Sequence, residues 1–497
     1  MIFDTLKDCK VLFCRTNNVL KLPHELQRLS TKHCDRHGHP LLEDIYPEIY
    51  LSRSYAKRHD ENLRELGVDN LSFKNILDRL DPYLQGDSPK YLDPALDDDW
   101  HTKIADLLMR AIKADNKRGD IRKRIKSMPL IPASRGGLIA AESADIYFPT
   151  DNKGHVIPED LPDIPTVDQI ALDNPSRRTL FKALGLTHCH PTRVIQSILK
   201  RYNRHDGVTL ADSVSHITYL FRTMEKDDTL DKRIFIMDQR EIRVYRASPT
   251  FGVPIIKDDL YIETLGDYGT KHLAETIAQN PREPDTPGFD IHLIHRTYID
   301  SVPAATLNHG RTFEQWLEEV ACVRRIPRLK HRQHDRLSDL SAHLAKYHPM
   351  ALIGLLKENW ERFQTELTPQ VIHLLGRMKV PTLNTLEGLT QSHELRETYY
   401  PSKEIQQLCS ITGVEQTFTL LLDIPSSSAT EDGRGWEFLA TLGVTFEPDL
   451  HFFSIVMKMV SEGYHEEEPS SNIEAAAYRI YRELALRFPN EGDEVCE

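Results

Sequence analysis

The sequence predicts a predominantly helical α+β chain, built of repeated helix-turn-helix units with short β-hairpins, and three observations predict it. Stretches with a 3.6-residue apolar period fill most of the chain between proline- and glycine-rich breaks. Strand-like segments are short, and one apolar pattern around a Leu-Gly step recurs three times. A length of 497 residues with 40% hydrophobic and 28% charged residues suits several ordinary globular domains.

Breaks in the periodic pattern divide the chain into five predicted segments. The break at 149–175 holds five prolines and few periodic apolar positions, which is typical of a linker or an extended arm. We expect these segments in order: a helical unit with a β-hairpin at 1–148, the proline-rich linker at 149–175, a mixed α/β unit at 176–330, a helical unit at 331–423 and a C-terminal helical unit at 424–497.

The recurring pattern is the most informative feature of the sequence. Its three Leu-Gly steps stand at residues 66–67, 184–185 and 442–443, and apolar residues recur at −3, +2, +10, +11 and +14 from each leucine. Glycine adopts the left-handed conformation that often ends a helix without a Cβ clash. Each copy therefore predicts a short helix, a turn, and a second helix that buries the last three positions; the alternative is a chance likeness between helix-turn-helix segments.

Several other elements follow from local patterns. Gly136 and Gly137 favour a hairpin turn between 128–131 and 138–140. A second hairpin is predicted for 233–237 and 242–245. Residues 337–367 show helical spacing that Pro349 divides, and 472–488 form an amphipathic helix for which Asn472 is the predicted N-cap.

Charge and composition limit the partners and the compartment. The 62 basic and 75 acidic residues give a net charge of −13, which argues against binding nucleic acid or an anionic membrane with the whole surface. No run of eighteen apolar residues occurs, so we expect no membrane partner. Seven scattered cysteines form no disulfide framework, and we expect an intracellular protein, cytoplasmic or nuclear.

No motif in the sequence specifies a reaction. Cys9 and Cys14 with His33 and His37 have zinc-like internal spacing, but the gap between the two pairs is longer than in zinc fingers. A nucleophile elbow and a phosphate-binding loop are also missing. We therefore predict no catalytic, cofactor-binding or metal-binding residue, and no cofactor.

A basic segment at 324–336 is the candidate interaction surface. It carries no interleaved aromatic residues, so base stacking is not indicated, and a solvated helix or a face that docks a partner is the favoured interpretation. The residues concerned are Arg324, Arg325, Arg328, Lys330 and Arg332.

Short packing and turn motifs also follow one another in an order that resembles a known family. They are Gly38–Leu42, Tyr50–Ser52, Leu63–Val68, Met128–Pro132 through Gly137 to Ile146–Pro149, Ile291–Tyr298, Phe313–Leu317 leading to Pro327, Trp360, Lys379–Pro381, Leu395–Pro401 and Trp436–Val444. This order resembles the region downstream of the GHKL-type ATPase domain in large fungal proteins of the sacsin / NO VEIN-like class. The family's Asp-x-Gly-x-Gly nucleotide loop has only one near match, Glu431–Gly435, which has Glu in place of Asp.

The resemblance implies a scaffold rather than an enzyme. We expect a noncatalytic protein-interaction region whose partner is a protein, such as an ATPase domain on a separate or longer chain. The first alternative is an enzyme with a site around His292 and His295, with Asp290 and Asp300 as acid and base. The second alternative is a nucleic-acid adaptor that uses the basic segment 324–336.

Overall fold

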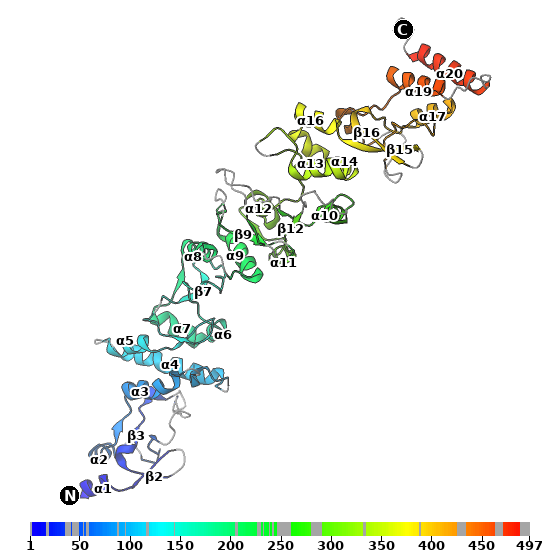
Figure 1. The fold of residues 1–497 in the computed structure, drawn as a ribbon. Helices are drawn as coiled ribbons and strands as arrows, with labels where there is room; N and C mark the ends of the chain where they lie inside the picture. The colour runs from blue at the N-terminus through cyan, green and yellow to red at the C-terminus, as the bar shows by residue number, and fades with distance from the viewer. Residues whose placement is uncertain are drawn as a thin grey trace. The chain divides into compact units, whose positions relative to one another are not determined.

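The protein is described by a computed structural model, and its chain divides into two compact units. Unit 1 comprises residues 1–235 and 301–310, and unit 2 comprises residues 236–300 and 311–497. The structure describes residues 2–487 apart from 16–18, 35–40, 42–48, 53, 56–58, 87–88, 95, 116–118, 144, 204–206, 226–229, 232, 238, 241–242, 246–259, 280–290, 332–333, 387–388, 425–433 and 463–470. Figure 1 labels the helices and strands of both units.

Unit 1 is mainly helical. Its helices are α1 (Ile2–Lys7), α2 (Asp60–Glu65), α3 (Phe73–Leu84), α4 (Asp98–Ala114), α5 (Asp120–Ser127), α6 (Gln169–Asp173), α7 (Pro175–Leu184), α8 (Pro191–Asn203) and α9 (Leu210–Thr223). Its strands are β1 (Leu12–Phe13), β2 (Leu20–Lys21), β3 (Gln27–Arg28), β4 (Asp69–Asn70), β5 (Ile131–Pro132), β6 (Leu138–Ile139), β7 (Tyr147–Asp151), β8 (Thr187–Cys189) and β13 (Leu307–Asn308).

The main core of unit 1 lies where α3, α4 and α7 bury their apolar faces. Leu77, Leu108 and Phe181 are each almost fully buried in one cluster. Side-chain caps fix where these helices begin: the Ser72 hydroxyl and the Asp97 carboxylate accept backbone N–H groups in the first turns of α3 and α4.

Unit 2 combines helices with a longer hairpin. Its helices are α10 (Thr270–Gln279), α11 (Arg296–Asp300), α12 (Phe313–Glu319), α13 (Asp339–Tyr347), α14 (Pro349–Glu358), α15 (Trp360–Phe363), α16 (Pro369–Gly376), α17 (Lys403–Thr412), α18 (Phe438–Thr441), α19 (Leu450–Glu462) and α20 (Ser471–Arg487). Its strands are β10 (Arg243–Tyr245), β11 (Leu260–Tyr261), β12 (His292–Leu293), β14 (Arg311–Thr312), β15 (Lys379–Leu386) and β16 (Leu389–Glu394), while β9 (Phe235–Met237) begins at the last residue of unit 1.

Two apolar cores support unit 2. The larger one joins α13, α14 and α16 to β15, with Leu344, Leu356 and Val380 almost completely buried. The smaller one joins α17, α19 and α20 through residues such as Ile405 and Phe453. Several residues of the second core also line a pocket between these three helices.

The structure confirms the helix–glycine–helix pattern in all three predicted copies. The glycines Gly67, Gly185 and Gly443 have φ angles of 90°, 101° and 98°, and each follows a short helix. In each copy the residue after the glycine donates its N–H to the carbonyl five residues earlier, with N···O distances of 2.8, 3.2 and 3.1 Å. This bond defines a Schellman motif, which satisfies the last carbonyl groups of the helix.

Each Leu-Gly turn leads into a parallel strand contact that the sequence did not indicate. β4 pairs with β3 and β8 pairs with β7, both in parallel, and Thr445 forms a parallel bridge to Tyr399. The following helices α3, α8 and α19 bury the predicted positions, except that Ile195 is only partly buried. The repeated unit is thus two parallel extended segments joined through a helix, followed by a second helix.

A related turn without glycine occurs in unit 2. Cys322 follows α12 with a φ of 57°, the Val323 N–H donates to the Leu317 carbonyl, and Arg324 forms a parallel bridge to Tyr261. A Leu-Gly step could not predict this turn, because here a cysteine adopts the left-handed conformation.

The remaining expectations have mixed outcomes. The fold class is confirmed, the β5–β6 hairpin forms at Gly136 and Gly137, β9 pairs with β10, and Pro349 divides α13 from α14. The expected N-cap of the last helix is wrong, because α20 already begins at Ser471. The hairpin of β15 and β16 was not foreseen.

The five-segment division stays a prediction, because each of the two compact units includes several of the segments. The stretch 149–175, interpreted as a linker, contributes buried side chains to unit 1. Ile157, Leu161 and Val167 are at most 1% exposed. These residues anchor the stretch although its proline content is typical of an exposed connection.

Candidate docking groove

Three basic side chains of the segment 324–336, those of Arg325, Lys330 and Arg336, form ion pairs with carboxylates. Arg325 pairs with Glu314 at 2.8 Å, and Lys330 pairs with Asp335 at 3.0 Å. The Arg324 backbone joins β11, and the Arg328 carbonyl accepts bonds from the Ser338 and Ser341 hydroxyls. Arg332 lies outside the described residues. The ion pairs reduce the positive charge that these side chains could offer to a phosphate backbone.

The residues of the enzyme alternative make local contacts. His295 Nδ1 accepts a hydrogen bond from the Thr297 backbone N–H, and Asp300 pairs with Arg296 at 3.4 Å. His292 lies 3.4 Å from an Arg240 nitrogen on the surface, and Asp290 lies outside the described residues. Neither of the two pockets described below includes any of these residues.

Cysteines and metal ligands do not form a site within the described part of the chain. No group of three or more His, Cys, Asp or Glu side chains there is arranged to hold a metal ion. Cys14 is buried, Cys9 is exposed, and His37 is not described. Burial and the charge of Glu415 raise the pKa of the Cys409 thiol to about 12, so it stays protonated and unreactive.

Unit 1 contains two buried carboxylate networks that hold the 149–175 stretch on α9. The Asp151 carboxylate accepts the Tyr219 hydroxyl at 2.9 Å and the backbone N–H groups of Lys153 and His155. Asp160 contacts His216 Nε2 at 2.8 Å and Arg201 Nε at 3.2 Å. These groups satisfy one another inside the core, which indicates a structural role.

One pocket of unit 2, with a volume of about 410 Å³, lies between the loop before α10 and the helices α12 and α14. Its charged side chains are mostly paired, with Arg362 3.6 Å from Glu318 and Arg325 bound to Glu314. Tyr268 packs directly on Gly354, where a Cβ atom would lie 1.9 Å from the ring. Glu358 is the charged lining residue that has no ion pair among the described residues, and burial and the nearby Asp267 raise its pKa.

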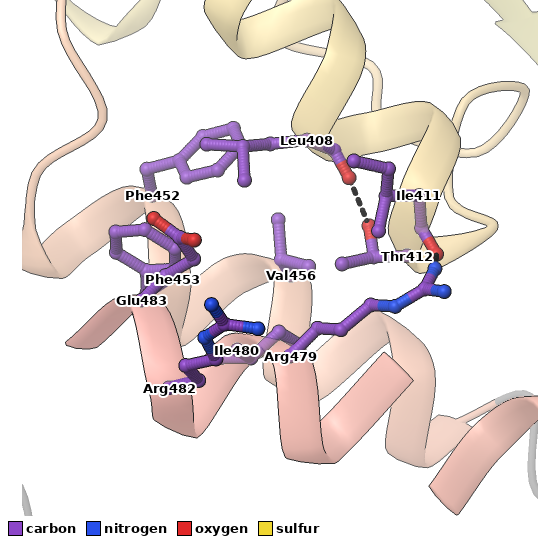
Figure 2. Close-up of a pocket in the computed structure, with 10 residues that line it drawn as sticks. All are labelled: Leu408, Ile411, Thr412, Phe452, Phe453, Val456, Arg479, Ile480, Arg482 and Glu483. Carbon is purple, nitrogen blue, oxygen red and sulfur yellow. Dashed lines mark hydrogen bonds between the residues drawn. The ribbon is translucent and has the colours of Figure 1, made fainter. Parts of the chain in front are cut away.

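The other pocket, about 340 Å³, opens between α17, α19 and α20 and is called here the docking groove (Figure 2). Figure 2 shows apolar side chains from the three helices around a common space, with the Arg482 guanidinium on the α20 side and the Arg479 side chain reaching across to Ile411 on α17. Its lining residues are Leu408, Ile411, Thr412, Phe452, Phe453, Val456, Arg479, Ile480, Arg482 and Glu483.

The floor of the groove is rigid because aromatic packing and a helix cap fix it. Phe452 lies 5.6 Å from the Tyr399 ring and 5.1 Å from the Phe418 ring, both centroid distances. Asp449 accepts the Phe452 N–H at 2.7 Å and the Tyr399 hydroxyl at 3.0 Å. Burial and this carboxylate raise the pKa of Tyr399, so its hydroxyl remains a donor.

The rim of the groove carries apolar and cationic groups together. Ile411 is 38% exposed, and Leu486 on α20 is 65% exposed. Leu486 follows Arg479 by seven residues, two turns along the same helix face. The exposed apolar surface therefore continues from the groove toward the end of α20.

Sequence analysis missed this groove for a physical reason. Its residues come from α17, which ends at Thr412, and from α19 and α20, which begin at Leu450 and Ser471, and single-sequence periodicity does not show which helices pack together. One available signal was the 472–488 helix, whose Tyr478, Tyr481 and Leu486 do not belong to its buried stripe of Ile480 and Leu484.

Among the described residues, no helix is both long and apolar enough to span a membrane. No family model, curated protein or solved structure matches the chain.

Proposed function

We propose that the chain is a noncatalytic protein-interaction module and that the docking groove binds a short segment of a partner protein through a bulky apolar side chain. The resemblance to the region downstream of the ATPase domain in sacsin / NO VEIN-like proteins motivates a protein partner. The observation that carries the proposal is the half-open apolar groove on a fixed three-helix floor.

The size and lining of the groove favour a side chain of a helical or extended peptide. A volume of about 340 Å³ accommodates one or two large apolar side chains, and Phe452 and Phe453 offer aromatic walls. Binding of an amphipathic helix in a groove between helices is a recurrent mode of peptide recognition. The exposed Ile411 and Leu486 extend the apolar contact beyond the pocket itself.

The test is selection of a random peptide display library on the full-length protein. We expect enriched peptides that share a bulky apolar residue, and we expect their binding to be lost when Val456→Trp fills the groove. Ile411→Glu at the exposed rim gives a second variant that does not disturb the buried floor. Peptides that bind Ile411→Glu and Val456→Trp as tightly as the unmodified chain would contradict the proposal.

A matched control separates the groove from general surface effects. Ile170 on α6 of unit 1 is 77% exposed, and Ile170→Glu makes the same chemical change outside the groove. Binding by this variant is expected to equal that of the unmodified chain. Circular dichroism checks that each variant keeps its helix content.

A further inference from the structure

We propose, on the basis of the function proposed above, that the partner segment is acidic and places carboxylates beside its apolar anchor, where Arg479 and Arg482 receive them. Both arginines line the groove on α20 and are exposed. They stand three residues apart, so both project from neighbouring positions on the helix surface.

The other charges around the groove are already engaged. Glu483, the one carboxylate in the lining, pairs with Arg487 at 3.3 Å, and Arg487 also bonds Glu404 on α17. Burial lowers the pKa of Arg487, but the hydrogen bonds and negative charges of these two carboxylates together outweigh it and hold the pKa above its usual value. Within the described residues, Glu483 thus pairs with Arg487 and not with Arg482.

The two rim arginines differ in what holds them. Arg479 donates one hydrogen bond to the Ile411 carbonyl at 3.2 Å, which fixes its guanidinium beside the apolar opening. The described residues provide no ion-pair partner for Arg482 within 4 Å, and Figure 2 shows its guanidinium on the α20 side of the groove, apart from that of Arg479. Guanidinium groups bind carboxylates in a planar, two-pronged geometry.

The net charge of the whole chain also favours the groove as the place where an acidic segment binds. With a net charge of −13, the protein repels an acidic segment over most of its surface. The arginine-edged groove is a local exception, because it combines an apolar contact with two cationic groups. An acidic segment is therefore directed to this groove, and a basic segment is not.

The experiment uses two fluorescein-labelled helical peptides and the full-length protein. The acidic peptide carries one phenylalanine flanked by glutamates, and the neutral peptide has glutamine at each of those positions. We expect the acidic peptide to bind about tenfold more tightly, and we expect Arg482→Glu to remove this difference between the two peptides. The preference should shrink severalfold as sodium chloride rises from about 50 to about 300 mM.

Lys458→Glu on α19 is the matched control, because it makes the same charge change at a residue outside the lining. It is expected to change the affinity for the acidic peptide less than about twofold. One outcome would overturn the charge preference but still support the proposed docking function. In that outcome both peptides bind the unmodified protein equally well, and Ile411→Glu abolishes the binding of both. The inference would also be overturned if the groove bound neither peptide. It would be overturned as well if the protein bound phosphatidylserine vesicles but not the acidic peptide.

Discussion

Gly443 shows at the scale of one residue why the Leu-Gly steps matter. Its φ of 98° is strained for any other residue, and an added Cβ atom would lie 2.7 Å from the Arg396 Cβ atom. Gly413, at the end of α17, has a φ of 73° and open space around it. Alanine substitutions at the two glycines can therefore be compared. The comparison distinguishes the free-energy cost of the left-handed conformation from that of a steric clash.

Gly443→Ala should therefore destabilise unit 2 more than Gly413→Ala does. We expect a loss of about 1 kcal/mol in the free energy of unfolding for Gly413→Ala and about 3 kcal/mol for Gly443→Ala. Urea unfolding of the full chain, followed by circular dichroism, measures both. Equal losses would mean that Arg396 moves aside without cost.

The buried Asp160–His216 contact gives a second residue-scale prediction. Burial would raise the pKa of the Asp160 carboxyl, but hydrogen bonds and positive charge from His216 and Arg201 outweigh it and hold the pKa below its usual value. A depressed carboxyl pKa stabilises the fold above the unfolded-state pKa of about 3.9, and this contribution is lost as the pH falls through the folded-state value.

Asp160→Asn should consequently lower the free energy of unfolding near pH 7 by about 2 kcal/mol and weaken its dependence on pH below about 4. Asp163→Asn is the control, because Asp163 pairs with Lys200 on the exposed surface and such a pair contributes less than about 1 kcal/mol. Thermal unfolding measured at a series of pH values distinguishes the two. A pH profile of Asp160→Asn that matches the unmodified chain would refute this assignment.

At the scale of elements, α19 depends on Asp449, which joins a helix cap to a buried hydroxyl. Its carboxylate accepts both the Phe452 N–H and the Tyr399 hydroxyl. Loss of the carboxylate leaves the first turn of α19 uncapped and the buried hydroxyl of Tyr399 without this partner. The orientation of Phe452 in the groove floor follows from the same contact.

Asp449→Ala should lower the free energy of unfolding by about 2 kcal/mol. In a Tyr399→Phe background the cost should fall by about 1 kcal/mol, because the hydroxyl no longer needs an acceptor. Chemical unfolding of the two single variants and the double variant measures this coupling. Strictly additive losses would show that Tyr399 and Asp449 do not stabilise each other.

The elements also show what a single sequence can predict. Helix ends at Leu-Gly steps, the division at Pro349 and the hairpin at Gly136 depend on local backbone preferences, so they were predicted. The parallel contacts of β4 and β8 depend on residues about forty positions earlier in the chain, and strands as short as these show no clear alternation of apolar and polar residues. The turn at Cys322 has a residue in the left-handed conformation, as the three Leu-Gly turns do. That residue is a cysteine and not a glycine, so the Leu-Gly pattern did not predict this turn.

At the scale of the molecule, the candidate site could be predicted less well than the fold. The basic segment 324–336 attracted attention because its charges are adjacent in sequence, yet Glu314, Asp335 and Asp339 pair with them in space. The groove charges stand on one helix, but their importance depends on the apolar floor that α17 and α19 supply. The proposed docking function therefore depends on the packing of three helices, and no single sequence motif predicts it.

Methyl-resolved nuclear magnetic resonance of the full chain, titrated with a peptide selected on it, tests the central claim most directly. The account predicts that the largest shift changes occur at groove methyl groups, namely those of Leu408, Ile411, Val456 and Ile480. The methyl group of Ile170 in unit 1 should remain unchanged and serves as the internal reference. Shift changes that leave the groove unaffected and cluster elsewhere would contradict the account.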